Sequence, residues 1–342
     1  MDSTLKKLRV ALVGCGRVSI MHFAAMESLK DKCTLVAVCD NKKDRADACA
    51  KKYGVKAYYN YEEMLDNVVL DAVHIVLPHY LHVPCAEYAI NKGVNVLCEK
   101  PMSVDYESAE RATNLAKQKG VLYGIISQCR YNNSAKLVKS TIESGELGKI
   151  ISVRSTLTWS RDDDYYMSSD WKGTWDKEGG GVVIDQAIHS IDLVHWIVNS
   201  KVKTLTCSMA NRGHSFVKVE DTAEGLITYE NGVKYVFYCM NNYGCDEPIE
   251  IRMYCEKGKV VFGYDDAYIY FNDGKVLEAH QSEDVVDVGG KDYWGFQHEK
   301  QIKQFYNACL GIEELDISAE EALKTHKLIC DIYKIGKETF NK

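Results

Sequence analysis

One short stretch of the sequence ends an apolar run in residue types that could do chemistry. Residues 96–104 read VLCEKPMSV, so Glu99, Lys100 and Pro101 follow a predicted buried strand. A lysine ammonium can donate a hydrogen bond to an oxygen that gains negative charge, and a carboxylate can accept hydrogen bonds. Because polar residues also end many strands as a solvated turn, this stretch gains a function only if other parts of the chain support one.

A second stretch places an acid and an imidazole on a predicted helix. Residues 179–196 read GGGVVIDQAIHSIDLVHW, in which Asp185, His189 and Asp192 fall on one stripe. Since histidine exchanges a proton near neutral pH, this stripe could supply acid–base chemistry. The pattern also fits an ordinary amphipathic helix, and we expect His195, on the neighbouring stripe, to be a packing or surface residue.

A glycine-containing loop near the start of the chain predicts dinucleotide binding. The sequence VGCGRVS at 13–19 follows a predicted strand and opens a predicted helix. Gly14 permits a tight turn, and Gly16 lets backbone N–H groups approach a pyrophosphate at the helix N-terminus. Ser19 stands where the GxGxxG pattern has its third glycine. The cofactor contacts predicted from this loop are Gly14, Gly16, Arg17 and Val18.

An acid at the end of the second predicted strand supports the same interpretation. Asp40 lies near the position where a carboxylate would bind the 2′-hydroxyl of a dinucleotide ribose. A carboxylate there repels a 2′-phosphate, which favours NAD over NADP. Lys42, Lys43 and Arg45 lie just beyond it. These three cations either weaken the preference for NAD over NADP or form the solvated start of a helix.

These residues need a framework that brings the ends of several strands together. The first 128 residues alternate near-continuous Val/Ile/Leu runs with helical stretches, which predicts a parallel sheet covered on both faces. We therefore expect an α/β fold whose N-terminal domain, residues 1–128, is a doubly wound Rossmann sheet. The predicted strands are 8–14, 34–40, 71–78, 94–100 and 121–127.

The remainder of the chain has a different pattern of apolar and polar residues. Its strand candidates alternate between apolar and polar residues and are joined in places by Asn-Gly and Asp-Gly turns. This predicts that residues 149–290 form a large, mostly antiparallel open sheet in a second, α+β domain, residues 129–342. Helices near 295–310 and 318–340 close the chain and could pack back on the first domain.

Composition narrows the functional classes. A formal net charge of −7 over 342 residues argues against a nucleic-acid partner, which needs a basic face. No apolar run is long enough for a membrane span, and the first residues lack the features of a signal peptide. The 13 cysteines include no CxxC pair and many lie in apolar runs. We therefore expect reduced thiols in a cytoplasmic protein, with neither a zinc site nor a disulfide framework.

Together, these features resemble the Gfo/Idh/MocA oxidoreductase family. The resemblance rests on the glycine loop, the acid after the second strand, the segment LPHYLHVPCAEYAINKGVNVLCEKP and the pattern GGG…D…H…D. It covers nearly the whole chain. It implies a Rossmann domain and a second domain whose open sheet pairs between subunits in a homodimer or homotetramer. It also implies that Lys100, Asp185 and His189 form the catalytic group.

The chemistry that this resemblance implies is the oxidation of an alcohol by NAD. His189 would take the hydroxyl proton, Lys100 would stabilise the charge that develops on the same oxygen, and Asp185 would orient the substrate or influence the histidine. A hydride would pass to nicotinamide C4. Because the lysine already supplies an electrophile, we expect no catalytic metal.

The resemblance also suggests further cofactor contacts. The Lys100–Pro101 peptide bond is expected to be cis. Glu99 could reach the nicotinamide ribose, or it could pair with a nearby cation. The other residues expected to flank the cofactor are Pro78, His79 and His82, which follow the strand 71–78 and also fit an ordinary polar loop.

The stretch before the glycine triplet predicts the substrate class. Residues 159–175 read WSRDDDYYMSSDWKGTW, and aromatics among hydrogen-bonding groups suit a polyol ring. The tryptophans could instead fill the core beneath the loop. Arg161 and Lys172 could also bind a carboxylate or phosphate, as on a nucleotide sugar. The sequence therefore does not decide whether the substrate is a free sugar, a cyclitol or a nucleotide sugar. The predicted substrate contacts are Arg130, Arg154, Trp171, Lys172 and Trp175, together with Asp185 and His189.

Three functions are consistent with these residues. The first is an NAD(H)-dependent dehydrogenase that acts on a secondary hydroxyl of a sugar or cyclitol. The second is a glycoside-cleaving enzyme in which tightly bound NAD oxidises the sugar transiently before elimination. The third is a non-catalytic, dinucleotide-binding regulator, against which the presence of Lys100, Asp185 and His189 argues.

Overall fold

The computed structural model describes residues 7–280 and 297–340, and within them the chain forms two compact units. The first unit comprises the chain as far as Gln128 and a later segment that ends at Leu323. The second unit takes the chain from Cys129 onward and again from Lys324. Each unit is built around its own sheet.

The first unit contains a six-stranded sheet, and the predicted parallel arrangement is confirmed. Its order is β3-β2-β1-β4-β5-β6, which is the doubly wound Rossmann order. The reversal between β1 and β4 creates the switch point beyond which ligands bind in such sheets. The strands are β1 (Leu8–Val13), β2 (Cys33–Cys39), β3 (Lys56–Tyr58), β4 (Ala72–Ile75), β5 (Asn95–Cys98) and β6 (Tyr123–Ile125).

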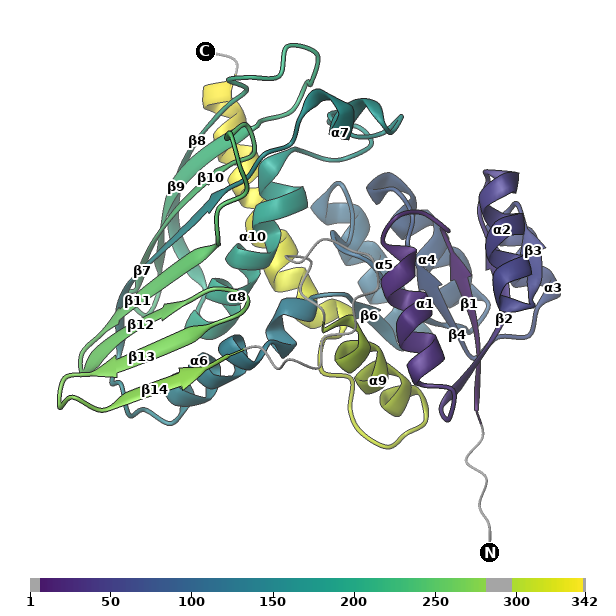
Figure 1. The fold of residues 1–342 in the computed structure, drawn as a ribbon, viewed down its shortest axis with the longest axis horizontal. Helices are drawn as coiled ribbons and strands as arrows, with labels where there is room; N and C mark the ends of the chain where they lie inside the picture. The colour runs from purple at the N-terminus through teal and green to yellow at the C-terminus, as the bar shows by residue number, and fades with distance from the viewer. Residues whose placement is uncertain (1–6, 281–296, 341–342) are drawn as a thin grey trace, which may run out of the picture. The chain divides into compact units, whose positions relative to one another are not determined.

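Helices cover both faces of this sheet (Figure 1). On one face α1 packs with α9, and on the other α4 packs with α5 and against β4 and β5. This double cover explains why all four residues of β4 are buried. The sequence did not predict β3 or α3, because elements this short show no clear period. The helices are α1 (Ser19–Ser28), α2 (Lys43–Tyr53), α3 (Tyr61–Asn67), η1 (His79–Leu81), α4 (His82–Asn91), α5 (Tyr106–Lys119) and α9 (His298–Cys309).

The second unit contains an eight-stranded sheet in the order β14-β13-β12-β11-β7-β10-β9-β8. Only the central pair β7 and β10 is parallel, so the predicted, mostly antiparallel sheet is confirmed for the described residues. Residues 281–290 of the predicted segment lie outside them. The strands are β7 (Ile150–Thr158), β8 (Val202–Ala210), β9 (Thr222–Tyr229), β10 (Lys234–Met240), β11 (Glu250–Cys255), β12 (Gly258–Phe262), β13 (Ala267–Phe271) and β14 (Val276–Ala279).

Helices cover one face of this second sheet (Figure 1). α6 packs against β13 and β14, and α8 packs against β7. The opposite face keeps alternate residues of the strands exposed, as in Leu226, Val236, Tyr254 and Tyr270. No described helix is long and apolar enough to cross a membrane. The helical elements are η2 (Gln128–Tyr131), α6 (Asn133–Glu143), α7 (Asp163–Met167), the π-helical turn η3 (Val183–Ala187), α8 (Ile188–Val198) and α10 (Ala319–Phe340).

Candidate functional site

The glycine loop after β1 has the shape that a dinucleotide needs. Gly14 has a φ of +100°, and a Cβ there would come within 2.2 Å of the Val76 carbonyl oxygen, so a larger residue would push β1 away from the segment after β4. A Cβ on Gly16 would meet no atom within 4 Å. This open space lies before the N-terminus of α1, where backbone N–H groups point out of the helix. The loop therefore fits a pyrophosphate.

Asp40 connects this loop to the start of α2. Its Oδ2 accepts the Cys15 N–H at 2.8 Å, and its Oδ1 accepts the Lys42 N–H at 2.8 Å. The carboxylate is 8% exposed. Each oxygen has a second lone pair with which it can accept a further hydrogen bond, so Asp40 can both hold the loop and bind a ribose hydroxyl.

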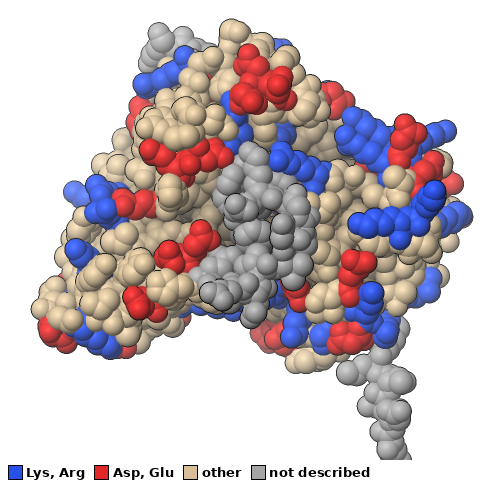
Figure 2. Space-filling model, viewed as in Figure 1, with Lys and Arg blue, Asp and Glu red and all other residues tan. Residues whose placement is uncertain are grey.

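Basic side chains gather over α2 (Figure 2). Lys42, Lys43 and Arg45 are exposed, whereas Asp40 is buried. Their exposure agrees with the interpretation of these cations as a solvated helix start. Arg17, one of the predicted cofactor contacts, is also exposed, and Val18 lies at the N-terminal boundary of α1.

Lys100 follows β5 at the carboxyl edge of the parallel sheet. Its side chain is half-buried, and its peptide bond to Pro101 is cis, which confirms that prediction. Its backbone N–H donates to Glu99 Oε2 at 3.2 Å. Lys100 belongs to the first unit, whereas Asp185 and His189 belong to the second. The convergence of these three residues on one substrate therefore stays a prediction.

Glu99 is buried among histidines that the sequence analysis did not connect with it. Its Oε1 lies 3.0 Å from His22 Nε2 and 3.2 Å from His298 Nε2. Burial by itself would raise the pKa of Glu99, but the hydrogen bonds from the two histidines hold it well below its ordinary value. The three ligand atoms lie within 4.8 Å of one another, close enough for a metal ion, yet direct hydrogen bonds already pair each of them.

The two histidines that follow β4 are also buried. His82 has its ring nitrogens 2.7 Å from the carbonyl oxygens of Leu77 and Pro101. The ring centres of His79 and His82 are 5.8 Å apart, and Pro78 precedes both residues in the chain. His82 therefore connects the segment after β4 to the segment after β5, which fixes two strand ends that face a bound cofactor in this type of sheet.

Asp185 lies in the π-helical turn at the start of α8. Its Oδ2 accepts hydrogen bonds from the Tyr165 hydroxyl at 2.5 Å and from Gln186 Nε2 at 2.6 Å. The Lys172 ammonium lies 3.3 Å from the centre of the Tyr165 ring. His189, half-buried, follows on the same helix. The sequence analysis did not single out Tyr165, although it lies in the stretch predicted to bind substrate and contacts the predicted site residue Asp185.

Asp192, the third residue of the predicted stripe, has a different environment. It forms a buried ion pair with Arg130, whose Nη2 and Nε lie 2.6 and 2.8 Å from its two oxygens. Thr325 donates a further hydrogen bond at 2.6 Å. Burial would raise the pKa of Asp192, but these partners lower it. Arg130, predicted to contact substrate, is 5% exposed. The pair therefore fixes α8 to neighbouring segments of the unit.

The other predicted substrate residues lie in varied places within the second unit. Trp175 packs edge-on against Tyr333 and Phe340, with ring centres 5.6 and 5.5 Å apart, which matches the core-filling alternative. Arg154 is exposed on β7 and pairs with Glu250 at 3.5 Å. Trp171 and Lys172 are half-buried in the loop after α7. His195 stacks on Tyr229, as expected for a packing residue.

The glycine triplet lets a buried acid approach the start of the helix that carries Asp185. Glu220 accepts the N–H groups of Gly181 and Val183 at 2.9–3.1 Å and the Tyr333 hydroxyl at 2.7 Å. A Cβ on Gly181 would lie 1.9 Å from the Glu220 carbonyl oxygen. Burial raises the pKa of Glu220 to about 7, and the hydrogen bonds that it accepts offset this effect only in part. The glycine triplet therefore allows Glu220 to pack closely against the start of the helix that carries Asp185.

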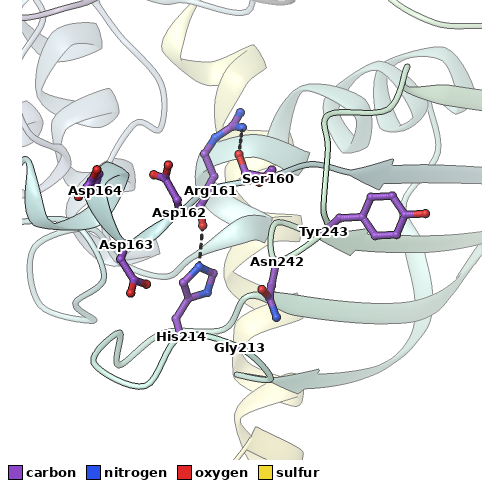
Figure 3. Close-up of a pocket in the computed structure, with 9 residues that line it drawn as sticks. All are labelled: Ser160, Arg161, Asp162, Asp163, Asp164, Gly213, His214, Asn242 and Tyr243. Atoms are coloured by element: carbon purple, nitrogen blue, oxygen red, sulfur yellow. Dashed lines mark hydrogen bonds between the residues drawn. The ribbon is translucent and has the colours of Figure 1, made fainter.

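A polar pocket of about 430 Å³ is lined in part by residues 160–164, which belong to the stretch predicted to bind substrate (Figure 3). Its rim includes the exposed acids at 162–164. The Arg161 guanidinium lies 3.0 Å from Asp246 Oδ1, and His214 lies 2.6 Å from the Arg161 carbonyl oxygen and 3.2 Å from Asp221. The Asp221 carboxylate raises the pKa of His214. The pocket presents hydrogen-bonding groups that suit a hydroxyl-rich ligand.

Comparison with known proteins agrees with this geometry. The chain is 25% identical to D-glucoside 3-dehydrogenase of Escherichia coli (strain K12), over 97% of this chain and 96% of that protein. It is 25% identical to inositol 2-dehydrogenase of Salmonella typhimurium, over 70% and 69%. The structure of the WlbA dehydrogenase of Bordetella pertussis, in complex with NADH and UDP-GlcNAcA, superimposes with a TM-score of 0.84 at 27% identity and 97% coverage of each chain.

Two family matches account for both parts of the sequence. Residues 8–127 match an oxidoreductase family with an NAD-binding Rossmann fold. Residues 135–261 match the C-terminal domain of the GFO/IDH/MocA group. The glycine loop, Asp40 and the six-stranded sheet described above are the structural counterpart of the first match. The chain therefore belongs to the Gfo/Idh/MocA family of NAD(P)-dependent oxidoreductases.

Proposed function

We propose that this protein transfers a hydride between a secondary hydroxyl of a sugar or cyclitol and nicotinamide C4 of NAD. The observation that carries the proposal is the hydrogen bond from Tyr165 to Asp185, on the helix that also presents His189. It holds a carboxylate that precedes an imidazole by four residues on contiguous helical turns, in a protein whose family binds NAD. Lys100 is the third member of the proposed catalytic group.

Each residue has one task in the proposed reaction. Bound NAD supplies the hydride acceptor. His189 accepts the hydroxyl proton of the substrate and returns it in the reverse direction. Lys100 donates a hydrogen bond to the same oxygen and stabilises its negative charge while hydride leaves the carbon. Asp185, held by Tyr165 and Gln186, accepts a hydrogen bond from a neighbouring hydroxyl and so orients the ring.

NAD is the proposed cofactor in preference to NADP. The carboxylate of Asp40 lies against the glycine loop and would repel a 2′-phosphate. The three nearby cations project to solvent and offer no enclosed phosphate site. Each of the thirteen cysteines is a free thiol, which is typical of a reducing, cytoplasmic environment.

The relatives indicate three candidate substrate classes. Their names give a glucoside, an inositol and a UDP-linked sugar acid. Lys172 beside Tyr165, and Trp171 on the same loop, would contact a sugar ring and an anionic group. We favour a glycoside or free sugar, because Arg161, the other cation of this loop, is already paired with Asp246.

A homodimer or homotetramer through the second sheet accompanies this function. The exposed face of that sheet carries Leu226 and Val236, which are direct cross-strand partners, and Tyr254 and Tyr270, which share Lys259 as neighbour. Apolar side chains in register on one face suit a second sheet packed against them. Arg154 lies in the same row as Val236 and would belong to that interface.

The proposal is tested with the purified protein, NAD and a panel of sugars, cyclitols, glycosides and nucleotide sugars. NADH formation is expected with one class, and the variants His189→Ala and Lys100→Met should lose about 10²–10⁴-fold in kcat/KM while still binding NAD. Trp175→Phe is a matched control, because its ring packs in the core. Activity that survives in both catalytic variants would contradict the assignment.

The similarity to a glucoside 3-dehydrogenase also favours testing glycoside cleavage. If oxidation of a sugar hydroxyl is followed by elimination of the aglycone, addition of water to the unsaturated sugar and return of the hydride to the ketone, the aglycone is released without net NADH. Chromatography of the products from an aryl glucoside distinguishes this route from simple oxidation, which leaves the glycosidic bond intact and accumulates NADH.

A further inference from the structure

A chain of hydrogen bonds runs through the core of the first unit and ends on Glu99. The Tyr306 hydroxyl lies 3.0 Å from His74 Nε2, and His74 Nδ1 lies 2.8 Å from His22 Nδ1. His22 Nε2 then reaches Glu99 Oε1 at 3.0 Å. All four residues are buried, with at most 6% exposure. The strands and helices involved are far apart in sequence, so their meeting is a property of the fold.

The donor and acceptor roles in this chain follow from the carboxylate at its end. An ionised Glu99 can only accept, so His22 must donate from Nε2 and, as a neutral ring, accept at Nδ1. His74 then donates from Nδ1 and accepts at Nε2, and Tyr306 donates its hydroxyl proton. Burial lowers the pKa of His22 and, further, that of His74, which keeps both rings neutral. With these roles, each hydrogen bond of the chain has one donor and one acceptor. The net charge of the four side chains is then −1, and it lies on Glu99.

His298 and Lys100 complete the environment of that charge. His298 Nε2 approaches Glu99 Oε1 at 3.2 Å from α9, and the Lys100 backbone N–H donates to Oε2 at 3.2 Å. A carboxylate with three donors is a stable anion even when buried. Glu99 is therefore a fixed negative charge immediately after β5.

The position of β5 determines what this charge acts on. In a doubly wound sheet the β1–β3 half takes one mononucleotide and the β4–β6 half takes the other. Because Asp40 marks the adenosine half at the end of β2, the nicotinamide half lies beyond β4, β5 and β6. The nicotinamide ring is positively charged in NAD and neutral in NADH, so a nearby fixed charge affects the two forms differently.

We propose that Glu99, held as an anion by the Tyr306–His74–His22 chain and by His298, makes the protein bind NAD more tightly relative to NADH. This inference rests on the proposed function, which places the nicotinamide beside Lys100. An anion near the ring stabilises the positively charged form of the ring by direct Coulomb attraction. Linkage then requires the bound cofactor to have a lower reduction potential, and a tenfold change in the ratio of affinities corresponds to about 30 mV for two electrons. The hydride would be given up more readily in the direction of carbonyl reduction.

The test compares dissociation constants of NAD and NADH for four proteins. Glu99→Gln keeps the shape and removes the charge, and should shift the ratio on the order of tenfold toward NADH. Glu99→Asp keeps the charge and disturbs the hydrogen bonds, and should leave the ratio near that of the wild type. Asp71→Asn is the matched control, because its carboxylate also accepts a backbone N–H, from Arg9 at 2.7 Å, but at the amino end of β4.

Two further variants secure the result. If Glu99→Gln does not fold, the double variant Glu99→Gln/His298→Gln places two amides of similar volume together without charge, and the same shift is expected. Lys100→Met removes a positive charge and should shift the ratio in the opposite direction. An unchanged ratio in the glutamine variants, or an equal shift in Glu99→Asp, would overturn the inference. Wild-type protein that binds both cofactors but oxidises no member of the panel would instead overturn the proposed function.

Discussion

Glu99 in the first unit and Glu220 in the second are both buried, and the two carboxyl groups behave in opposite ways. Glu99 in the first unit meets two imidazoles, which hold its pKa well below the ordinary value. Glu220 in the second unit meets only backbone N–H groups and a tyrosine hydroxyl, and burial raises its pKa to about 7. Both residues are buried, Glu99 with 6% and Glu220 with 0% of its surface exposed. The difference shows that the identity of the donors, more than depth, decides whether a buried acid carries charge.

The largest expected effect comes from removing the charge of Glu99. Glu99→Gln should lower the free energy of unfolding by on the order of 3 kcal/mol at pH 7, because two buried imidazole donors lose an anionic acceptor. Since the pKa of Glu99 is lowered on folding, its contribution is present above about 4.5, the ordinary value, and is lost as the pH falls further. Urea unfolding at neutral and acid pH measures this. A deficit that grows toward acid pH would contradict it.

Glu220 should give the opposite pH dependence. Its folded pKa of about 7 exceeds the ordinary 4.5, so the wild type loses stability as the pH rises through this interval. Glu220→Gln removes that loss and should gain on the order of 1–3 kcal/mol relative to the wild type between pH 4.5 and 8. The same unfolding series, run in parallel with Glu99→Gln, tests the contrast. Equal slopes in both variants would remove the basis of the comparison.

Asp185 is a half-buried acid that accepts hydrogen bonds from the Tyr165 hydroxyl and the Gln186 amide. Tyr165→Phe removes the hydrogen bond at 2.5 Å and should lower kcat/KM about tenfold, with a small change in melting temperature. Tyr166→Phe is the control, because that buried hydroxyl is bonded to Asn241 instead. A loss of stability without a loss of activity in Tyr165→Phe would assign the hydroxyl to packing.

The smallest effect is expected at Asp40, a buried acid whose carboxylate accepts hydrogen bonds from two backbone N–H groups. Asp40→Ser should weaken NAD and raise the relative affinity for NADP about fivefold, because the repulsion of a 2′-phosphate is removed. Asp44→Ser, an exposed acid on α2, is the control. Dissociation constants of both cofactors measure the change, and an unchanged preference would mean that another residue contacts the ribose.

Much of the fold could be predicted because its signals are local. The run VNVLC reads as a strand buried on both faces, and Gly14 follows such a run at the one place where a Cβ would strike the Val76 carbonyl. The strands of the second sheet alternate because one face is exposed. Short elements such as β3 gave no signal, since three residues define no period.

The partners of the site residues were not predictable in the same way. The sequence identified Glu99 and Asp185, yet His22, His298 and Tyr165 were not connected with them. His22 reads as one polar residue on a helix of mixed composition, and His298 lies almost two hundred residues from Glu99. A single sequence carries no measure of which distant polar groups will be buried together, whereas buried polar groups require partners wherever the chain can supply them.

The sequence by itself determined the parallel and antiparallel sheets, the glycine loop and the residue types available for acid–base chemistry, because periodicity and turn chemistry depend on near neighbours. Only the tertiary structure decided which acids are charged. The same side chain is an anion beside His22 and His298 and tends to keep its proton beside Tyr333, since the free energy of a buried charge is set by groups that approach it through space.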